Sequence, residues 1–344
     1  MAMTAAALGY GHDDAGAAAP LAGRNVLFVL GAPRSGTTWL AKIFDSHPDV
    51  LYRHEPDTVL REERLPVLCR PEEVARYRDT ARAYLDRLLD IRTLKSAGSL
   101  PVFAKRYHGP LAQQVRAGIV FGLRLAEQAP GLAGWAKGVA IPDLLDRSGG
   151  GPAPLIVVKS VSSRGRARLF VEALPGCRIV FIVRHPCGQV ASMVRGVKLG
   201  KFEKRVPLDE ILATEQAVRR GLTRERFDAL SPVEQYAWHW AVLNQKALDD
   251  LAGVPGVKIV RYEDLGAEPV RTAQELFAFA GLSWDPQTAS FMETSTTYSG
   301  PDRYFQVTKN SIAAMNKWRT ELSLDDQRQI LDITKQTAVG RLFP

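Results

Sequence analysis

The chain has 344 residues, of which 46% are hydrophobic and 24% are charged. These proportions are those of an ordinary globular protein and exclude a low-complexity chain. The formal net charge of +8 suits a protein that binds a polyanion, whether a nucleotide, a nucleic acid or a membrane surface, and does not choose among them. No run of 18 apolar residues occurs, so we expect no membrane span.

The three cysteines, Cys69, Cys177 and Cys187, are widely spaced and form no CxxC pair. This pattern argues against a disulfide framework and against a zinc site, and it favours a reducing, cytoplasmic setting. Residues 1–23 are rich in Ala and Gly and lack the basic start and the apolar core of a signal peptide. We therefore expect a disordered N-terminal tail, followed by a single domain from residue 24 to residue 344.

The stretch from Val26 to Leu40 predicts a buried strand, a tight turn and the start of a helix. An apolar run is followed by Gly-Ala-Pro-Arg-Ser-Gly and then by a helix-compatible segment. The first turn of such a helix leaves backbone N–H groups unpaired, and these groups form an anion site together with the helix dipole. The hydroxyl groups of Ser35, Thr37 and Thr38 add further donors.

Gly31 and Gly36 have the spacing of the nucleotide-triphosphate P-loop, Gly-x4-Gly-Lys-[Ser/Thr]. Thr37 stands at the lysine position, however, and the positive charge has moved to Arg34 inside the loop. A guanidinium group can hold two oxygens of a phosphate-like group, so this loop can stabilise an anion without a metal ion. A nucleotide kinase or another P-loop NTPase is thus disfavoured, and a non-catalytic nucleotide-binding protein stays open as a further alternative.

The segment Pro33–Trp39 resembles the 5′-phosphosulfate loop of sulfotransferases that use 3′-phosphoadenosine 5′-phosphosulfate (PAPS). The resemblance implies that this loop holds the 5′-phosphate and the sulfate, and that Trp39 stacks on adenine. Arg34 is more typical of the carbohydrate and protein-tyrosine branches, because cytosolic members usually carry lysine there. The loop residues implied in donor binding are Arg34, Ser35, Gly36, Thr37, Thr38 and Trp39.

Asp49–Tyr52 is predicted to form a short strand that leads to His54 and Glu55. Glu55 would lie at the edge of the anion site, where a carboxylate can accept a proton from an acceptor hydroxyl group. The resemblance supports this role, since carbohydrate and tyrosylprotein sulfotransferases place their catalytic glutamate shortly after the loop. His54 is the rival base, because histidine titrates near neutral pH.

Residues 60–150 are expected to form a helical insertion, with amphipathic helices over 72–94 and 111–126. The resemblance implies that this insertion lies over the site and forms much of the acceptor pocket. Its basic residues Lys105, Arg106 and His108 are interpreted as a solvated face. No signature of a particular acceptor can be seen, so a small molecule, a glycan and a peptide all stay open.

A second buried strand, Leu155–Val158, ends at Lys159. Ligands of doubly wound sheets bind beyond the carboxyl ends of the strands, so Lys159 should point into the same crevice as the loop. There it can neutralise the charge that builds on the bridging oxygen when the S–O bond of the donor breaks. The cytosolic sulfotransferase pattern is Lys-Thr-His, whereas this chain has Lys159-Ser160-Val161, and the base role therefore returns to Glu55.

A third strand, Arg178–Val183, leads to Arg184, and Ser192 follows in a predicted helix. This arrangement resembles the family's 3′-phosphate motif, in which an arginine and a serine at this spacing clamp the phosphate. By the same resemblance Tyr236 faces adenosine, although packing of its ring in the core is an equal alternative.

A fourth apolar strand starts at Val257, and further helices are predicted over 164–174, 236–251, 268–281 and 323–337. Residues 283–310 are predicted to form a long irregular arm. The wider segment 283–320 resembles the part of these enzymes that covers the donor, with Lys317 as a candidate phosphate contact.

Strands that alternate with helices predict an α/β fold with a mostly parallel sheet of P-loop type, flanked by helices. The predicted reaction transfers a sulfuryl group from PAPS to a hydroxyl group of a carbohydrate, lipid, peptide or secondary metabolite, and releases adenosine 3′,5′-bisphosphate (PAP). Glu55, Lys159 and Arg34 are the predicted catalytic residues. No metal ion and no nucleic acid are expected to take part.

Overall fold

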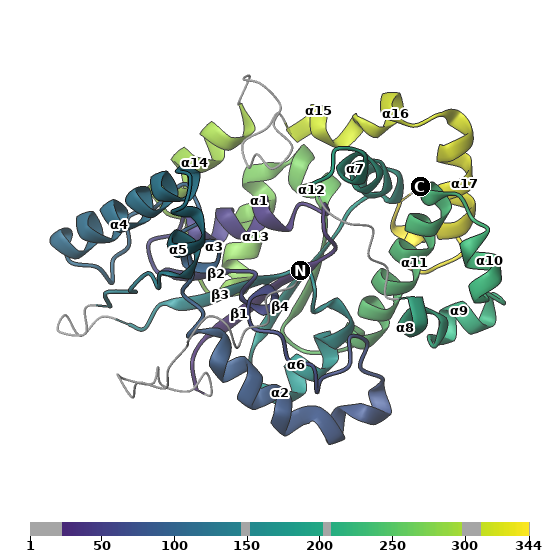
Figure 1. The fold of residues 1–344 in the computed structure, drawn as a ribbon, viewed down its shortest axis with the longest axis horizontal. Helices are drawn as coiled ribbons and strands as arrows, with labels where there is room; N and C mark the ends of the chain where they lie inside the picture. Colours follow the sequence, from purple (N-terminus) through teal and green to yellow (C-terminus); the bar gives the residue numbers. More distant parts are fainter. Residues whose placement is uncertain (1–22, 146–151, 202–207, 298–310, 344) are drawn as a thin grey trace.

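Five strands form one parallel sheet in the computed structural model, which describes residues 23–145, 152–201, 208–297 and 311–343 (Figure 1). The strands are β1 (Val26–Gly31), β2 (Val50–His54), β3 (Leu155–Ser160), β4 (Arg178–Val183) and β5 (Val257–Arg261). Their order in the sheet is β2-β3-β1-β4-β5, and every neighbouring pair runs parallel. The predicted α/β class and the predicted strands are confirmed.

The first strand of the chain lies at the centre of the sheet. Every residue of β1 is buried, as expected of a strand that is covered by helices on both faces. It pairs with β3 on one side, where Val26 lies opposite Ile156, and with β4 on the other, where Leu27 lies opposite Arg178. The loop after β1 therefore emerges in the middle of the carboxyl edge of the sheet.

Helices cover both faces of the sheet (Figure 1). One face carries α1 (Thr37–Asp45), α12 (Tyr262–Ala267), α13 (Pro269–Ala280) and α14 (Pro286–Thr296), and the other carries α2 (Val74–Leu88), α6 (Ala167–Ala173) and α11 (Pro232–Leu251). A pair of phenylalanine rings marks each of the two cores, stacked on the first face and tilted on the second. Phe44 lies 5.4 Å from Phe277 on the first face, and Phe28 lies 5.3 Å from Phe170 on the second.

A helical group surrounds α11 on the side of the molecule that holds the C-terminus (Figure 1). The long helix α7 (Pro186–Lys198) and the C-terminal helix α17 (Leu324–Thr334) both pack against α11. Short helices complete this side: α8 (Leu208–Leu212), α9 (Glu215–Arg219), α10 (Arg224–Asp228), α15 (Ser311–Asn316) and α16 (Trp318–Glu321). None of the helices within the described ranges is long and apolar enough to cross a lipid bilayer.

The predicted insertion over 60–150 divides into two parts. Its first helix, α2, packs against α6 beneath the sheet, so it belongs to the core. The later helices α3 (Leu94–Ala97), α4 (Pro110–Gln128) and α5 (Ala133–Gly138) form a separate group beside β2 (Figure 1). Helix α3 of this second part packs against β2, the edge strand that leads to Glu55.

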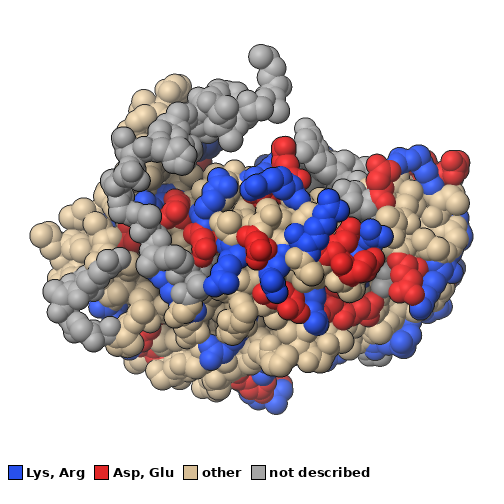
Figure 2. Space-filling model, turned by 90° about the horizontal axis from the view of Figure 1, so that it is seen from below, with Lys and Arg blue, Asp and Glu red and all other residues tan. Residues whose placement is uncertain are grey.

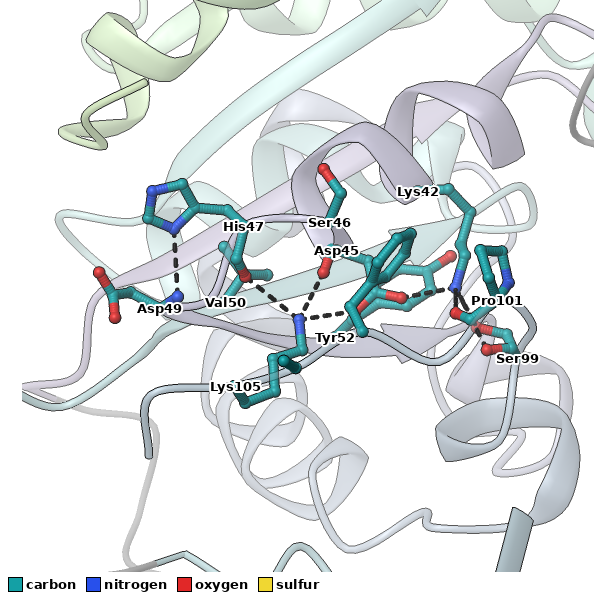
Figure 3. A network of polar contacts seen from close by, with 12 residues as sticks. Lys42, Asp45, Ser46, His47, Asp49, Val50, Tyr52, Ser99, Pro101 and Lys105 are labelled. Atoms are coloured by element: carbon teal, nitrogen blue, oxygen red, sulfur yellow. Dashed lines mark hydrogen bonds and ion pairs between the residues drawn. The ribbon is translucent and has the colours of Figure 1, made fainter. Parts of the chain in front are cut away.

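A buried network of charges fastens the second part to α1 (Figure 3). Lys42 donates from Nζ to Asp45 Oδ2 at 2.6 Å and to the Pro101 carbonyl oxygen at 2.8 Å. Lys105 approaches the same carboxylate from the other side, with Nζ 3.0 Å from Asp45 Oδ1. Both lysines are almost fully buried, so the interpretation of Lys105 as part of a solvated face is wrong. Lys105 is buried because its ammonium group pairs with the buried carboxylate of Asp45.

The other two basic residues of that predicted face also have partners in the fold. His108 is buried, and its Nδ1 lies 2.9 Å from Gln113 Oε1. Arg106 is half exposed, yet its guanidinium group joins Asp49 to Asp285. Arg106 is thus held by acidic residues directly before β2 and directly before α14, and the sequence around residue 106 gives no sign of these contacts.

Residues 283–310 do not form a wholly irregular arm, because α14 occupies 286–296. Asp285 caps this helix by accepting a hydrogen bond from the Gln287 N–H at 2.8 Å, and Pro286 stands at its first position. Phe291 and Met292 are buried against the core. The Asp-Pro start signal was present in the sequence and was missed.

Several sequence-based expectations lie outside the described residues. They are the tail over 1–22, residues 146–150 at the end of the predicted insertion, and the stretch 298–310 of the predicted arm.

Figure 2 shows the molecule from the side on which α2 lies, with basic and acidic side chains interspersed. Arg70 pairs with Glu73 just before α2 at 2.9 Å, and Arg168 pairs with Glu172 on α6 at 2.9 Å. Such exposed pairs each stabilise the fold only slightly. The net positive charge of the chain is therefore not gathered into one patch on this face.

Candidate active site

The loop between β1 and α1 has the geometry of an anion cradle. Gly36 has φ 96°, in the left-handed region, and a Cβ atom there would collide with the ring of Tyr262. A Cβ atom on Gly31 would collide with the Ile182 carbonyl oxygen. The first turn of α1 has no side-chain cap, so its N–H groups stay available to a ligand.

Arg34 joins the two motifs that the sequence singles out. Its Nε donates to Ser192 Oγ on α7 at 3.0 Å, and its carbonyl oxygen accepts from Arg184 Nη1 at 3.1 Å. Arg34 also has φ 69°, which is uncommon for a residue with a side chain. Strained backbone of this kind concentrates at functional sites. Two cations and a serine from distant parts of the chain thus meet beside the loop.

Tyr262 is a site residue that the sequence analysis missed. Its ring lies beneath Gly36, 4.7 Å from the guanidinium carbon of Arg184 and 6.1 Å from the ring of Trp39. Glu263, the next residue, has a structural role, because its side chain accepts a hydrogen bond from the His185 N–H at 3.0 Å. The tyrosine, in contrast, holds the glycine of the loop and the arginine of the second motif in register.

The other predicted donor-binding residues of the loop are mostly turned inward. Ser35 is fully buried and its hydroxyl group donates to the Ala32 carbonyl oxygen at 2.7 Å. Thr37 is buried, and Thr38 is partly exposed. Trp39 is 8% exposed, and its Nε1 donates to Ser295 Oγ at 3.3 Å. The stacking of Trp39 on adenine stays a prediction.

Glu55 and Lys159 form an ion pair at the carboxyl edge of neighbouring strands. Glu55 follows β2 directly, and its backbone N–H donates to the Lys159 carbonyl oxygen at 2.8 Å. Its φ of 46° lies in the left-handed region, which makes it the second strained non-glycine residue of the site. The predicted base and the predicted lysine are thus in contact with each other.

The second oxygen of Glu55 binds Lys95, which the sequence analysis did not identify. Lys95 lies on α3, and its Nζ is 3.0 Å from Glu55 Oε2 and 2.6 Å from Thr58 Oγ1. Its side chain is about half exposed, whereas that of Lys159 is buried. Nothing in the local sequence around residue 95 points to this contact, because it depends on how α3 packs against β2.

The protonation of this group follows from its surroundings. Burial raises the pKa of the Glu55 carboxyl group, but the neighbouring charges, led by Lys159, outweigh burial and lower the pKa to about 2. Burial lowers the pKa of Lys159, and the carboxylate of Glu55 opposes that change. In the absence of substrates, Glu55 is therefore a stable carboxylate with both oxygens paired.

His54, the rival base, lies beside this pair. Its Nδ1 is 2.8 Å from the Tyr52 hydroxyl oxygen, and its Nε2 is 4.0 Å from Glu55 Oε1. Burial, with the charge of Lys159 adding to it, lowers the pKa of His54 to about 3. The imidazole is thus neutral and already hydrogen-bonded.

Asp57 connects the turns that carry the two catalytic candidates. It lies in the short 3-10 turn Pro56–Thr58, and its Oδ2 accepts hydrogen bonds from the hydroxyl groups of Ser160 and Ser163. Burial raises the pKa of Asp57. The turn after β2 and the turn after β3 are therefore held together by a single side chain.

Tyr236 and Lys317, the remaining predicted donor contacts, lie near the second motif. Tyr236 is buried in a cluster with residues of α7 and with Trp318. Lys317 stands directly before α16, with Nζ 3.5 Å from Glu321 Oε1. Arg184 reaches this region too, because its Nη2 donates to the Ala314 carbonyl oxygen at 2.8 Å. The donor contacts of Tyr236 and Lys317 stay predictions.

Within the described residues, no group of three or more His, Cys, Asp or Glu side chains is arranged so that it could hold a metal ion. The candidate site consists of cations around an anion cradle, with the paired carboxylate of Glu55 beside it.

The chain belongs to the sulfotransferase family, whose sequence model matches residues 27–286. This span contains the loop, Glu55, Lys159, Arg184 and Ser192.

Two curated relatives illustrate the similarity. Carbohydrate sulfotransferase 3 of Mus musculus is 36% identical over 154 residues, which cover 41% of this chain and 28% of that protein. Carbohydrate sulfotransferase 2 of Homo sapiens is 35% identical over 80 residues, which cover 23% of this chain and 15% of that protein. The chain thus spans less than a third of the length of these relatives.

Solved structures resemble the whole chain more loosely. The sulfotransferase domain from the Synechococcus PCC 7002 olefin synthase is 18% identical, with a TM-score of 0.43, and the match covers 92% of this chain and 95% of that chain. The mouse sulfotransferase SULT7A1, complexed with PAP, is 12% identical, with a TM-score of 0.42, and the match covers 93% of this chain and 88% of that chain.

Proposed function

We propose that this protein transfers a sulfuryl group from PAPS to an acceptor hydroxyl group and releases PAP. The observation that carries the proposal is the meeting of Arg34, Ser192 and Arg184 beside the loop. A donor with a 5′-phosphosulfate and a 3′-phosphate needs two anion sites at a fixed separation. Family membership supports the same reading.

In the proposed reaction, the loop N–H groups and Arg34 hold the phosphosulfate, and Arg184 with Ser192 holds the 3′-phosphate. The acceptor oxygen forms a new bond to sulfur while the bond between sulfur and the bridging oxygen breaks. The electron pair of the broken bond stays on the 5′-phosphate of PAP, and the proton of the acceptor passes to Glu55. Positioning and electrostatic stabilisation supply the rate.

The ion pair explains how a carboxylate with so low a pKa can act as the base. As charge develops on the bridging oxygen, the Lys159 ammonium group is attracted toward it and away from Glu55. The loss of that neighbouring cation raises the pKa of Glu55, so its proton affinity rises when the acceptor proton must leave. Lys159 thus couples departure of PAP to deprotonation of the acceptor.

The proposal includes a cytoplasmic setting, which the three reduced and buried cysteines support. It also includes catalysis without a metal ion, since the charges needed come from side chains of the chain itself. The acceptor is a small molecule, a glycan or a peptide that carries a hydroxyl group.

Calorimetric titration with PAP, and separately with ATP and magnesium, tests the donor. Wild-type protein should bind PAP, and Arg184→Ala should lose most of this binding, because a bound phosphate would lose a guanidinium partner. Arg178→Ala is the matched control, since Arg178 lies at the opposite end of β4. Preference for ATP with magnesium would overturn the proposal in favour of a P-loop kinase. Equal PAP affinity in wild type and Arg184→Ala would show that Arg184 does not form a second anion site.

A further inference from the structure

Arg164 is a buried cation without a counter-ion among the described residues. Its side chain is 5% exposed, and its Nη1 is enclosed and makes no hydrogen bond. Burial lowers the pKa of Arg164 to about 10, so the guanidinium group is still charged at neutral pH. A buried charge destabilises the folded state unless an opposite charge or hydrogen bonds compensate it. An unpaired buried cation in a native fold therefore suggests that an anionic ligand binds beside it.

The position of Arg164 ties it to the catalytic candidates. It opens the 3-10 turn Arg164–Arg166, which follows the end of β3. Ser163, its neighbour in the chain, donates from its hydroxyl group to Asp57 at 2.8 Å. Asp57 stands two residues after Glu55, so the turn that carries Arg164 is fastened to the turn that carries the proposed base.

His239 lies on α11, the helix that contacts the same turn. The turn packs against α11, and the charge of Arg164 acts on the imidazole. Burial, with Arg164 adding to it, lowers the pKa of His239 to about 3, so the ring is neutral and carries one N–H group. No carboxylate group among the described residues acts on this ring, since burial and Arg164 alone shift its pKa. A guanidinium group and an imidazole donor therefore lie together without a carboxylate.

We propose that Arg164 and His239 bind an anionic group of the acceptor, either a carboxylate or a sulfate or phosphate ester. The inference rests on the proposed sulfuryl transfer. Arg34 and Arg184 already serve the two anionic groups of the donor, and they belong to a different cluster. The turn of Arg164 is instead fastened to that of Glu55, which meets the acceptor. The acceptor is thus an anionic hydroxyl compound.

Calorimetric titration of the PAP-saturated protein with sodium sulfate, at constant ionic strength, tests this subsite with a simple probe. Wild-type protein should bind sulfate, and Arg164→Gln should bind it at least about tenfold more weakly, because the amide lacks the charge and the fork of donors. Arg168→Gln is the matched control. It removes a cation four residues further on, from an exposed pair on α6, and should bind sulfate as the wild type does.

The outcomes separate the two proposals. Equal sulfate affinity in wild type and Arg164→Gln, or no sulfate binding by the PAP-saturated wild type, would overturn the subsite. Weakened PAP binding in Arg164→Gln would show that Arg164 binds an anionic group of the donor. That result would overturn its proposed role in binding the acceptor. Failure of the wild type to bind PAP at all would instead refute the proposed function.

The proposal can still be tested if Arg164→Gln fails to fold. Without sulfate, Arg164→Gln should melt no lower than the wild type, because it removes an unpaired buried charge. If that variant does not fold, Arg164→Lys and His239→Phe take its place. The first removes the parallel N–H donors of the guanidinium group, and the second removes the N–H donor of the imidazole. Both should weaken sulfate binding, and wild-type affinity in both would overturn the proposal.

Discussion

Glu55 has two cationic partners that differ in exposure to solvent. Lys159 is buried at the end of a strand, whereas Lys95 is half exposed on a helix of four residues. In the proposed reaction, we expect the acceptor hydroxyl group to approach Glu55 on the Oε2 side, where the exposed Lys95 can be displaced. At the scale of single residues, the site is therefore a carboxylate held between a buried lysine and an exposed one.

Glu55→Gln should lower kcat by about 100-fold or more, which is the usual contribution of a general base. PAP affinity should stay unchanged, because Glu55 contacts neither anion-binding motif. Steady-state kinetics and PAP titration on the same preparation measure both. His54→Gln is the matched control and should keep most of the activity; the reverse pattern would make His54 the base.

Lys95→Met should shift the acid limb of the pH profile of kcat/KM to higher pH. The pKa of Glu55 is about 2 because neighbouring cations favour its charged form, and removal of one of them raises it. The wild type should then show no loss of activity from this group until the pH is well below 4.5, the ordinary value for a glutamate. An unchanged profile in Lys95→Met would show that Lys95 does not act on the base. Lys137→Met, on α5, serves as the control.

At the scale of elements, two connections hold the site in place. The first is the contact of Tyr262 with the loop at Gly36. Gly36→Ala combines left-handed backbone strain of about 1–3 kcal/mol with a collision against that ring. PAP affinity should fall by about tenfold or more, since 1.4 kcal/mol corresponds to a factor of ten.

Gly176→Ala provides the control for this prediction. Gly176 has φ 85°, so alanine meets the same backbone strain there, but no atom lies within 4 Å of the added Cβ. This variant should be destabilised without loss of PAP affinity. If both variants bind PAP equally well in calorimetric titration, the contact with Tyr262 does not shape the donor site.

The second connection is the buried network of Figure 3. Asp45→Asn leaves Lys42 and Lys105 without their shared anion and should lower the free energy of unfolding by about 3 kcal/mol. The pKa of Asp45 is lowered: burial raises it, and the charges of Lys105 and Lys42 outweigh burial. The stabilisation is thus present above pH 3.8, the ordinary value, and is lost as the pH falls below it.

Urea denaturation at neutral pH and at pH values below that point measures the effect. The difference between wild type and Asp45→Asn should shrink on acidification. Asp90→Asn, at an exposed position after α2, should change little at any pH. A constant difference across the pH range would contradict the ionised state of Asp45.

At the scale of the whole molecule, features of local backbone structure could be predicted from the sequence. Contacts that depend on the packing of distant elements could not. The strands and the loop were predictable because apolar runs and a Gly-rich turn specify backbone structure directly. Lys95 and Tyr262 were not, since each reaches the site only through the position of a separate helix. The same holds for Arg164, whose unpaired charge is a property of the folded interior alone.

The sheet order also constrains how the chain folds during synthesis. The ribosome releases β1 and β2 first, yet these strands are not neighbours, because β3 lies between them. Val26 can pair with Ile156 only after the whole intervening insertion has been made. Until then two apolar strands have open edges, and non-local pairing of this kind is slow and prone to aggregation. A nascent chain that stalls before β3 should therefore depend on chaperones, whereas one that has passed β4 can close the centre of its sheet.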